Sequence, residues 1–260
     1  WDMGYGSYAA GSSRVNEYSW KENYYTTNIY SDYFKQFDNG HYFKVMAGFN
    51  AELYKTRNIT AEKNTLITPG VPTINTATDD PQAYGGYADN SVAGFFARVN
   101  WSYKDRYMFE ANGRYDGSSR LVGKERWGFF PSFSAGWNIA REPFMESFAE
   151  KINMGSLKLR ASWGQLGNTN TNDAWYPFYQ TMPVGSNYGW LVNGERPNYA
   201  TNPGIVSSKK TWETVETWDV GLDWSFFNNR LSGSFDYFVR YTYDMIGPAP
   251  ELSSLLGTSV

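Results

Sequence analysis

Long runs of alternating apolar and polar residues restrict the fold of this chain more than any other feature. Over residues 93–103 every odd position is apolar or aromatic, while the even positions include Arg98 and Asn100. A period of two predicts a β-strand with two unlike faces. The alternation resumes over 107–115 after a short polar turn at 104–105, so this segment is expected to form a long hairpin.

The same pattern recurs along the chain and predicts about eight long strands with no long helix. Besides the hairpin just described, strands are expected over 24–37 with 43–53, over 133–139, over 157–163, and over 212–226 with 231–243. A short helical turn is expected around 145–149. The strand over 24–37 has the least regular alternation of the set.

The expected connections fall into two length classes. Tight turns are predicted near 38–40, 104–105 and 228–229, and long loops at about 57–91, 116–128 and 167–210. Transmembrane β-barrels sort their connections in this way, with short periplasmic turns at one rim and long extracellular loops at the other. The expected strands also exceed the ~5–6 residues of an ordinary strand and reach the ~9–11 that cross a bilayer. The sequence therefore predicts an all-β, antiparallel transmembrane barrel wall.

Composition agrees with strands that have one face in lipid. Seventeen Phe, 21 Tyr and 11 Trp make up 19% of the chain, yet mean hydropathy is only −0.57. An apolar face and a wet face cancel in the average, which explains both values.

Several classes of function are excluded by what the chain lacks. It has no Cys and one His, which leaves no disulfide, thiolate zinc site, Cys nucleophile or His-based metal site. Its net charge of −3 gives no attraction to nucleic acid, and no run approaches the ~20 apolar residues of a membrane-spanning helix. We expect no enzymatic activity, cofactor, metal or nucleic-acid partner. Asp79, Asp80 and Asp89 could join a loop calcium site, but solvated loop charge is the simpler explanation.

The two faces of the predicted strands differ in chemistry. On 212–226 the apolar face is aromatic, then aliphatic, then aromatic, as expected for two interfacial girdles around a hydrocarbon band; it comprises Trp212, Trp218, Val220, Leu222, Trp224 and Phe226. The opposite face is too charged for a packed core and suits a lumen. The residues expected to line this lumen are Arg98, Asn100, Glu110, Asn112, Arg114, Lys158, Arg160, Asp219, Asp223, Asp236 and Arg240.

The loop over 167–210 carries the best candidates for substrate contact. Aromatic side chains stand there among Asn and Gly, which suits stacking on sugar rings or capture of a peptide. The candidates are Trp175, Tyr176, Tyr179, Tyr188 and Trp190, with Phe178 between them. The alternative is that these rings pack the loop against its neighbours or against a lid protein.

Specific strings add a resemblance to this pattern. They are GRYDGSSR at 113–120, RWGFFPSFSAGW at 126–137, LKLRASWGQLGN at 157–168, KVMAGFN at 44–50, NGERPNY at 193–199 and NNRL at 228–231. In this order they closely resemble the barrel region of the SusC/RagA family of TonB-dependent outer-membrane transporters, which is typical of Bacteroidetes. The resemblance covers about 24–260.

This resemblance implies a fold, a location and partners. Complete members have a barrel of about 22 strands around a plug domain. They import glycans or peptides with a SusD-like surface lipoprotein as lid and contact the TonB complex through a segment before the plug. The plug and the TonB-contacting segment have no counterpart here, and Val260 stands where such barrels end in an aromatic residue. We therefore expect residues 1–260 to form an incomplete barrel wall in the outer membrane of a Gram-negative cell, facing lipid and a glycan or peptide substrate.

Two other functions remain open at this point. A secreted, soluble all-β domain that binds or degrades carbohydrate would also be rich in aromatic and Asn residues. A receptor or adhesin barrel without transport would share the wall and differ in the plug.

Overall fold

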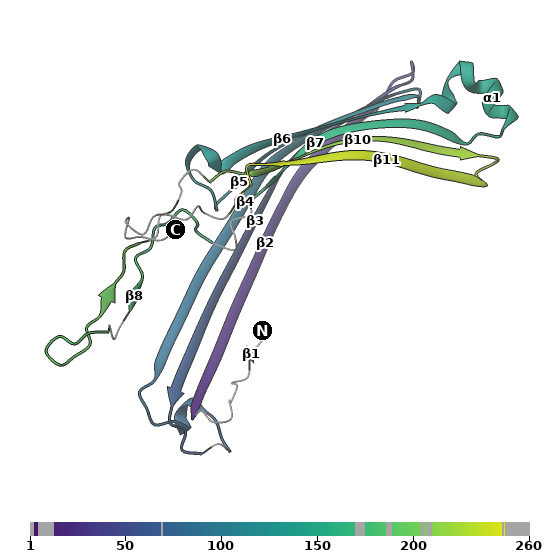
Figure 1. The fold of residues 1–260 in the computed structure, drawn as a ribbon. Coiled ribbons are helices and arrows are strands. Elements are labelled where there is room, and N and C mark those ends of the chain that lie inside the picture. Colours follow the sequence, from purple (N-terminus) through teal and green to yellow (C-terminus); the bar gives the residue numbers. More distant parts are fainter. Residues whose placement is uncertain are drawn as a thin grey trace. The chain divides into compact units, whose positions relative to one another are not determined.

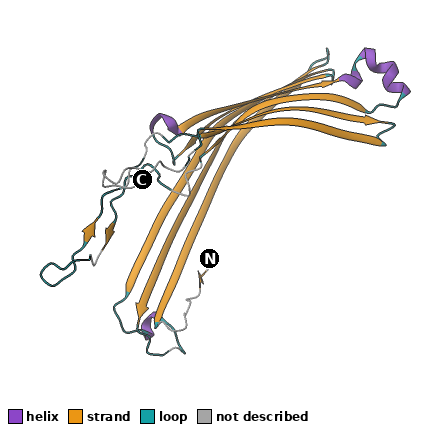
Figure 2. Ribbon diagram, in the orientation of Figure 1, coloured by secondary structure: helices purple, strands orange, loops and turns teal. Residues whose placement is uncertain are grey.

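The computed structural model describes residues 3–4, 13–68, 70–169, 175–185, 189–203, 206, 210–245 and 247. Antiparallel strands dominate these residues, as Figures 1 and 2 show. In the described part, the main sheet has the strand order β1-β2-β3-β4-β5-β6-β7-β10-β11, and β8 and β9 form a separate small pair. Each strand of the main sheet therefore lies beside its neighbours in the chain, as in an up-and-down barrel wall.

Eight of the described strands in the main sheet are long, which confirms the prediction of about eight. Their bounds are β2 Arg14–Gln36, β3 His41–Asn64, β4 Gln82–Tyr103, β5 Tyr107–Ser118, β6 Trp127–Asn138, β7 Ser156–Asn168, β10 Glu213–Phe226 and β11 Leu231–Tyr243. The short strands are β1 Met3–Gly4, β8 Val184–Gly185 and β9 Tyr199–Ala200.

The expected bounds were wrong for the first strands. β2 starts at Arg14 rather than near 24, β3 runs on to Asn64, and β4 already begins at Gln82. Only 65–81 therefore connects β3 to β4, and the loop predicted at 57–91 contains the ends of two strands. The reason is that both faces of these strand ends carry polar residues, so no apolar alternation marks them in the sequence.

The loop expected at 116–128 is also shorter in the structure, because β5 extends to Ser118 and β6 begins at Trp127, whereas the loop expected at 167–210 keeps its length and lies two residues later. The connection between β5 and β6 is 119–126, and the one between β7 and β10 is 169–212. At the other strand ends the connections are 37–40, 104–106 and 227–230. Lys104 and Asp105 both have positive φ, at 50° and 53°, as a two-residue hairpin turn requires.

Short helices lie only in connections within the described residues. The 3₁₀ turns are η1 Ile74–Thr76, η2 Gly123–Arg126, η3 Ile139–Arg141 and η4 Pro143–Met145, and the α-helix is α1 Glu146–Lys151. The helical turn expected around 145–149 is confirmed by α1. No helix in the described residues has the length and apolar character to cross a membrane.

The few buried apolar side chains centre on one cluster of Leu121, Phe130 and Trp212. The rings of Phe130 and Trp212 meet edge to face at 5.3 Å, and the Trp212 indole donates to the carbonyl of Arg126 at 3.2 Å. Trp212 was expected in the outward girdle, and this is wrong. It precedes Glu213, where β10 begins, so the alternation of the strand does not govern it.

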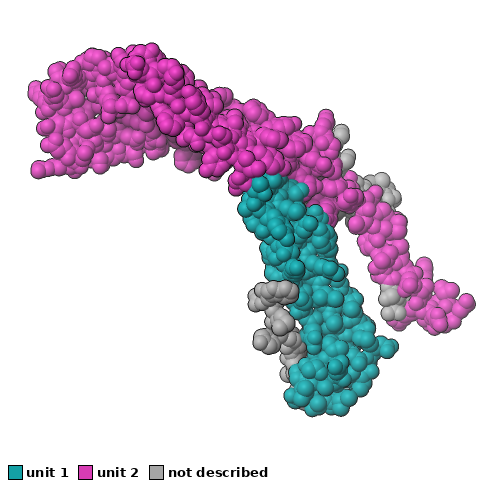
Figure 3. All heavy atoms as spheres, turned by 180° about the vertical axis from the view of Figure 1, so that it is seen from behind, with its two compact units in different colours: residues 1–27, 51–92 teal, residues 28–50, 93–260 magenta. Residues whose placement is uncertain are grey.

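The chain divides into two compact units, coloured separately in Figure 3. Unit 1 is 1–27 with 51–92 and holds one part of β2, β3 and β4 and the connection between β3 and β4. Unit 2 is 28–50 with 93–260 and holds the other part of these strands and everything after them. The parts of β2, β3 and β4 that belong to unit 1 are called the strand extension below.

Candidate functional site on the polar face of unit 2

The register of the strands collects the predicted lumen residues on one face. Gly221 of β10 pairs with Arg160 of β7 on one side and with Asp236 of β11 on the other. Asn112 of β5 pairs with Ser132 of β6. Because side chains alternate along each strand, the intervening apolar residues share the opposite face. Val220, Trp218, Phe235 and Tyr237 on that face are 51–64% exposed in the isolated chain.

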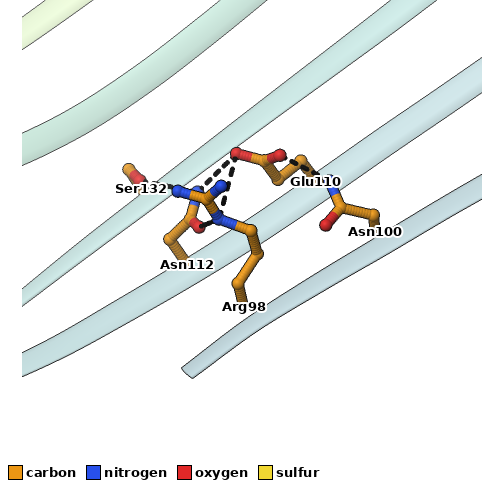
Figure 4. Close-up of polar contacts among 5 residues, drawn as sticks. All are labelled: Arg98, Asn100, Glu110, Asn112 and Ser132. Carbon is orange, nitrogen blue, oxygen red and sulfur yellow. Dashed lines mark hydrogen bonds and ion pairs between the residues drawn. The ribbon is translucent and has the colours of Figure 1, made fainter. Parts of the chain in front are cut away.

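Five side chains from β4, β5 and β6 form one hydrogen-bonded network, drawn in Figure 4. Arg98 Nε donates to Asn112 Oδ1 at 2.5 Å and lies 3.9 Å from Glu110 Oε1. Asn112 Nδ2 donates to Glu110 Oε1 at 2.8 Å and to Ser132 Oγ at 3.3 Å, and Asn100 donates to the other oxygen of Glu110. Four predicted residues thus come together, and Ser132 was missed.

Arg114 forms a second contact beside this network, with a partner that sequence reasoning missed. Its Nε and Nη2 donate to the two carboxylate oxygens of Asp116 at 3.0 and 2.9 Å, and its guanidinium carbon lies 5.7 Å from the ring centre of Phe96. A Cβ at Gly94 would overlap the Asp116 carboxylate. Asp116 has even number in β5, like Arg114, and this parity could have placed it on the polar face.

Arg160 joins three strands. Its Nε and Nη2 donate to Asp223 at 2.7 and 2.9 Å, and Nη2 also donates to Asp236 at 2.9 Å. A Cβ at Gly221 would lie 2.8 Å from Arg160 Nη2, so the glycine leaves the space in which the guanidinium lies across β10. The bidentate geometry is the stronger form of an arginine–carboxylate pair. This triad links β7, β10 and β11.

The other predicted lumen residues share the polar face without an ion pair among the described residues. Lys158 pairs with Asp223 in the backbone register, Asp219 with Ser162, and Arg240 with Thr217. Lys158 and Asp219 line a hollow of about 450 Å³ on this face, and an adjoining one of about 420 Å³ contains Arg98 and Arg114.

The chemistry of the polar face is hydrogen bonding and charge pairing. No group of three or more His, Cys, Asp or Glu in the described residues could hold a metal ion. Both hollows combine charged and amide side chains with aromatic ones, including Phe96 and Phe130 in one and Tyr42 in the other. Such a surface can contact a polar body in the lumen at many points.

The predicted loop aromatics lie in the connection between β7 and β10. Tyr176 and Tyr179 meet edge to face at 6.0 Å, and the guanidinium of Arg120 lies 5.6 Å from the ring of Trp175. Trp190 and Tyr179 are 65% and 63% exposed, and Tyr188 lies outside the described residues. Sequence reasoning missed the exposed apolar side chains near β8 and β9, which are Met182, Val184, Leu191 and Val192.

The connection between β6 and β7 is fastened by Glu142. The Trp137 indole donates to its carboxylate at 2.9 Å, and Arg106 Nη1 lies 3.8 Å from it. A hydrogen bond from the Tyr107 hydroxyl, the bond from Trp137 and the charge of Arg106 hold the pKa of Glu142 below its ordinary value, although desolvation opposes them.

Comparison with known proteins identifies the fold. A family model described as "TonB dependent receptor-like, beta-barrel" matches residues 1–259. Two solved structures share the fold. The RagAB peptide transporter matches with a TM-score of 0.79 at 20% identity, and the RagAB peptide importer in the open-open state with 0.78 at 21%. Each match covers 95% of this chain and 26% of that one.

Relatives give the same answer. TonB-dependent receptor SusC of Bacteroides thetaiotaomicron is 31% identical over 259 residues, which are 93% of this chain and 25% of that protein. TonB-dependent receptor P26 of Formosa agariphila is 34% identical over 175 residues, or 67% of this chain and 16% of that one. The chain therefore spans about a quarter or less of the length of these relatives.

These matches confirm the resemblance seen in the sequence. They also exclude one of the two alternative functions, the secreted soluble domain. The relatives are described as receptors rather than enzymes. A secreted soluble domain is wrong, because SusC/RagA-type proteins lie in the outer membrane of Bacteroidetes. The chain is part of an outer-membrane barrel wall and belongs to the TonB-dependent receptor-like β-barrel family, in its SusC/RagA branch.

Proposed function

We propose that this chain forms part of the wall of an importer that takes up a glycan across the outer membrane in a TonB-dependent way. The observation that carries the proposal is the contrast between the two faces of β5, β6, β7, β10 and β11. One face holds paired charges and amides, and the other holds exposed aromatic and aliphatic side chains. The aromatic and aliphatic face is the one that can lie in lipid. The charged face suits a lumen that contains water or a plug.

The connections give the wall its orientation. The tight connections at 37–40, 104–106 and 227–230 face the periplasm, and those at 65–81, 119–126 and 169–212 face outwards. Residues 1–260 contain no Cys, so a single Cys introduced there is the only thiol of this segment, and the parent protein without the substitution gives the background. Asp80→Cys should react with a membrane-impermeant maleimide on intact cells, and Asn229→Cys should react only after lysis. The reverse result would contradict the orientation.

The partners follow from the family. We propose that a SusD-like surface lipoprotein covers the outward connections, and that the TonB complex acts through a plug segment that this chain does not contain. The exposed apolar side chains near β8 and β9 fit contact with such a lid. Loss of the lipoprotein should abolish uptake while the barrel remains in the membrane.

A glycan is the cargo that the 169–212 connection favours, because exposed rings offer flat apolar surfaces to sugar rings. The test compares binding of neutral oligosaccharides and of mixed peptides to the complete transporter, with Tyr179→Ala and Trp190→Ala as variants. Both variants should weaken oligosaccharide binding about tenfold, as loss of ~1–1.5 kcal/mol at a ring contact implies. Phe144→Ala, an equally exposed ring between β6 and β7, is the matched control.

Two outcomes would replace this function. Peptide binding that depends on the same two rings would make the cargo a peptide, as for the RagAB peptide transporter. Binding with no uptake in a strain with intact TonB would make the protein a receptor or adhesin rather than an importer.

A further inference from the structure

The strand extension separates its charges by face. Trp20 of β2 donates to Thr56 of β3 at 2.5 Å, and Arg14 pairs with Glu62 at 3.7 Å, so even-numbered residues of β2 and β3 share one face. A Cβ at Gly86 would contact the Asn58 side chain, which places even residues of β4 there too. This even face carries Glu22, Glu52 and Glu62, with Tyr24, Tyr54 and Tyr84. We call the opposite face the odd face.

The odd face of the extension is basic. Lys55, Arg57 and Lys63 follow one another on β3, and Lys21 lies on the same face of β2. The acidic groups on this face are Glu17 and Asp89. Within the described residues, none of the three β3 cations lies within 4 Å of a carboxylate. Positive charge therefore exceeds negative charge on this face.

The cations of β3 begin directly after the apolar residues of the same face. Odd residues from Phe43 to Leu53 are all apolar. The segment from Phe43 to Leu53 contains eleven residues, which is about what a tilted strand needs to cross the hydrocarbon layer. Lys55 is the next residue on that face, so the cations begin where the apolar band stops.

A hollow of about 630 Å³ adjoins Arg57. Residues of both faces line it, with Arg57, Ile59 and Tyr87 from the odd face and Asn58 and Tyr84 from the even face. The ring of Tyr87 is 59% exposed, and Lys55 precedes Arg57 on the odd face outside this lining. Arginine presents a planar fork that matches phosphate oxygens, and lysine adds a point charge. A tyrosine ring offers a flat surface to a sugar. A ligand that carries phosphate on sugar and sits just above the hydrocarbon layer matches all of these groups.

We propose that Lys55, Arg57 and Tyr87 bind the phosphorylated headgroup of a glycolipid in the outer leaflet of the outer membrane. The inference uses the outward orientation proposed above, which Cys labelling tests by itself, and it is independent of the cargo. The bound headgroup neutralises the exposed Arg57 and the half-buried Lys55 and fastens the extension to the membrane surface.

The test measures binding of purified lipopolysaccharide to the complete transporter in detergent. Each cation near an anionic surface contributes about a fivefold change in binding, so Lys55→Gln with Arg57→Gln should weaken binding about 25-fold and lower its salt dependence. Lys35→Gln with Lys104→Gln removes the same charge near the tight turns and should leave binding unchanged. Enzymatically dephosphorylated lipopolysaccharide should bind wild type about as weakly as native lipopolysaccharide binds the double variant.

Three results would overturn the proposal. The first is unchanged binding in the Lys55/Arg57 variant, and the second is an equal loss in the control variant. The third is competition by phosphatidylglycerol vesicles as effective as that of lipopolysaccharide, which would show a general anionic surface instead. Thermal melting without lipid should agree within about 2 °C among the variants, because none of the substituted cations forms an ion pair among the described residues.

Discussion

The eight long strands of the main sheet fall into two groups that differ nearly twofold in length. β5, β6, β7, β10 and β11 have 12–14 residues, whereas β2, β3 and β4 have 22–24. The bilayer explains the first length, since a tilted strand crosses it in about 9–11 residues. It does not explain the second. The contrast teaches that alternation in the shorter strands reflects contact with lipid, whereas the additional length of β2, β3 and β4 has another cause.

The largest expected effect on stability comes from placing a charge in the membrane-spanning strands rather than in the strand extension. Val220 of β10 and Ile59 of β3 are 51% and 54% exposed in the isolated chain, so exposure alone does not distinguish them. Val220→Arg places a charge in the hydrocarbon layer and should destabilise the barrel by about 2–4 kcal/mol. Ile59→Arg should cost under about 0.5 kcal/mol. Melting of the complete transporter in lipid nanodiscs measures both, and equal losses would show that the extension also lies in lipid.

Glycines give the next contrast. A Cβ at Gly48 would lie 2.7 Å from the carbonyl oxygen of Ile29 and 2.7 Å from Cβ of Tyr30, which cannot move freely. At Gly86, in the extension, the near group is the flexible end of Asn58. Gly48→Ala should cost about 1–3 kcal/mol through overpacking, and Gly86→Ala much less. The same melting assay decides, and a costly Gly86→Ala would mean that the extension is packed as tightly as the wall.

A smaller difference in stability is expected between Arg160, which pairs with carboxylates, and Arg57, which forms no ion pair among the described residues. Arg160→Leu leaves Asp223 and Asp236 without their partner; because the arginine is a third exposed, we expect a loss of only about 1–2 kcal/mol. Arg57→Leu removes no ion pair among the described residues and should be neutral. Restoring part of the loss in Arg160→Leu by adding Asp236→Asn would assign it to carboxylate repulsion, while no restoration would contradict that cause.

The smallest effect concerns pH at the connection between β6 and β7. The folded pKa of Glu142 is lowered, so its contribution to stability is present above the unfolded pKa and is lost as pH falls through the folded one. Wild type should therefore lose stability on acidification below about pH 4–5, and Glu142→Gln should lose less. Melting temperatures between pH 3 and 7 test this. Parallel curves for the two proteins would exclude Glu142 as a source of acid sensitivity.

The sequence predicted the membrane-spanning parts of the strands well and the strand extension poorly. The hairpin of β4 and β5 was found because lipid imposes an apolar face at residues such as Phe95 and Phe109. Residues 14–23 and 57–64 were missed, since their strands have polar groups on both faces. At the site, parity placed Arg98 and Arg160 correctly. Asp116 was overlooked because a short polar residue near a strand end looks like a turn, and Ser132 because the strand was expected to begin only at 133, whereas β6 begins at Trp127.

The self-pairing of charge on the polar face has a consequence for traffic through the barrel. Arg98, Arg114 and Arg160 each pair with a carboxylate of the wall, so the charges of this face without an ion pair among the described residues are those of Lys158, Asp219 and Arg240. We expect such a surface to retard cations and anions alike only weakly, as a neutral conduit does. If the proposed import function holds, discrimination among solutes falls to the connections at the two rims rather than to the wall.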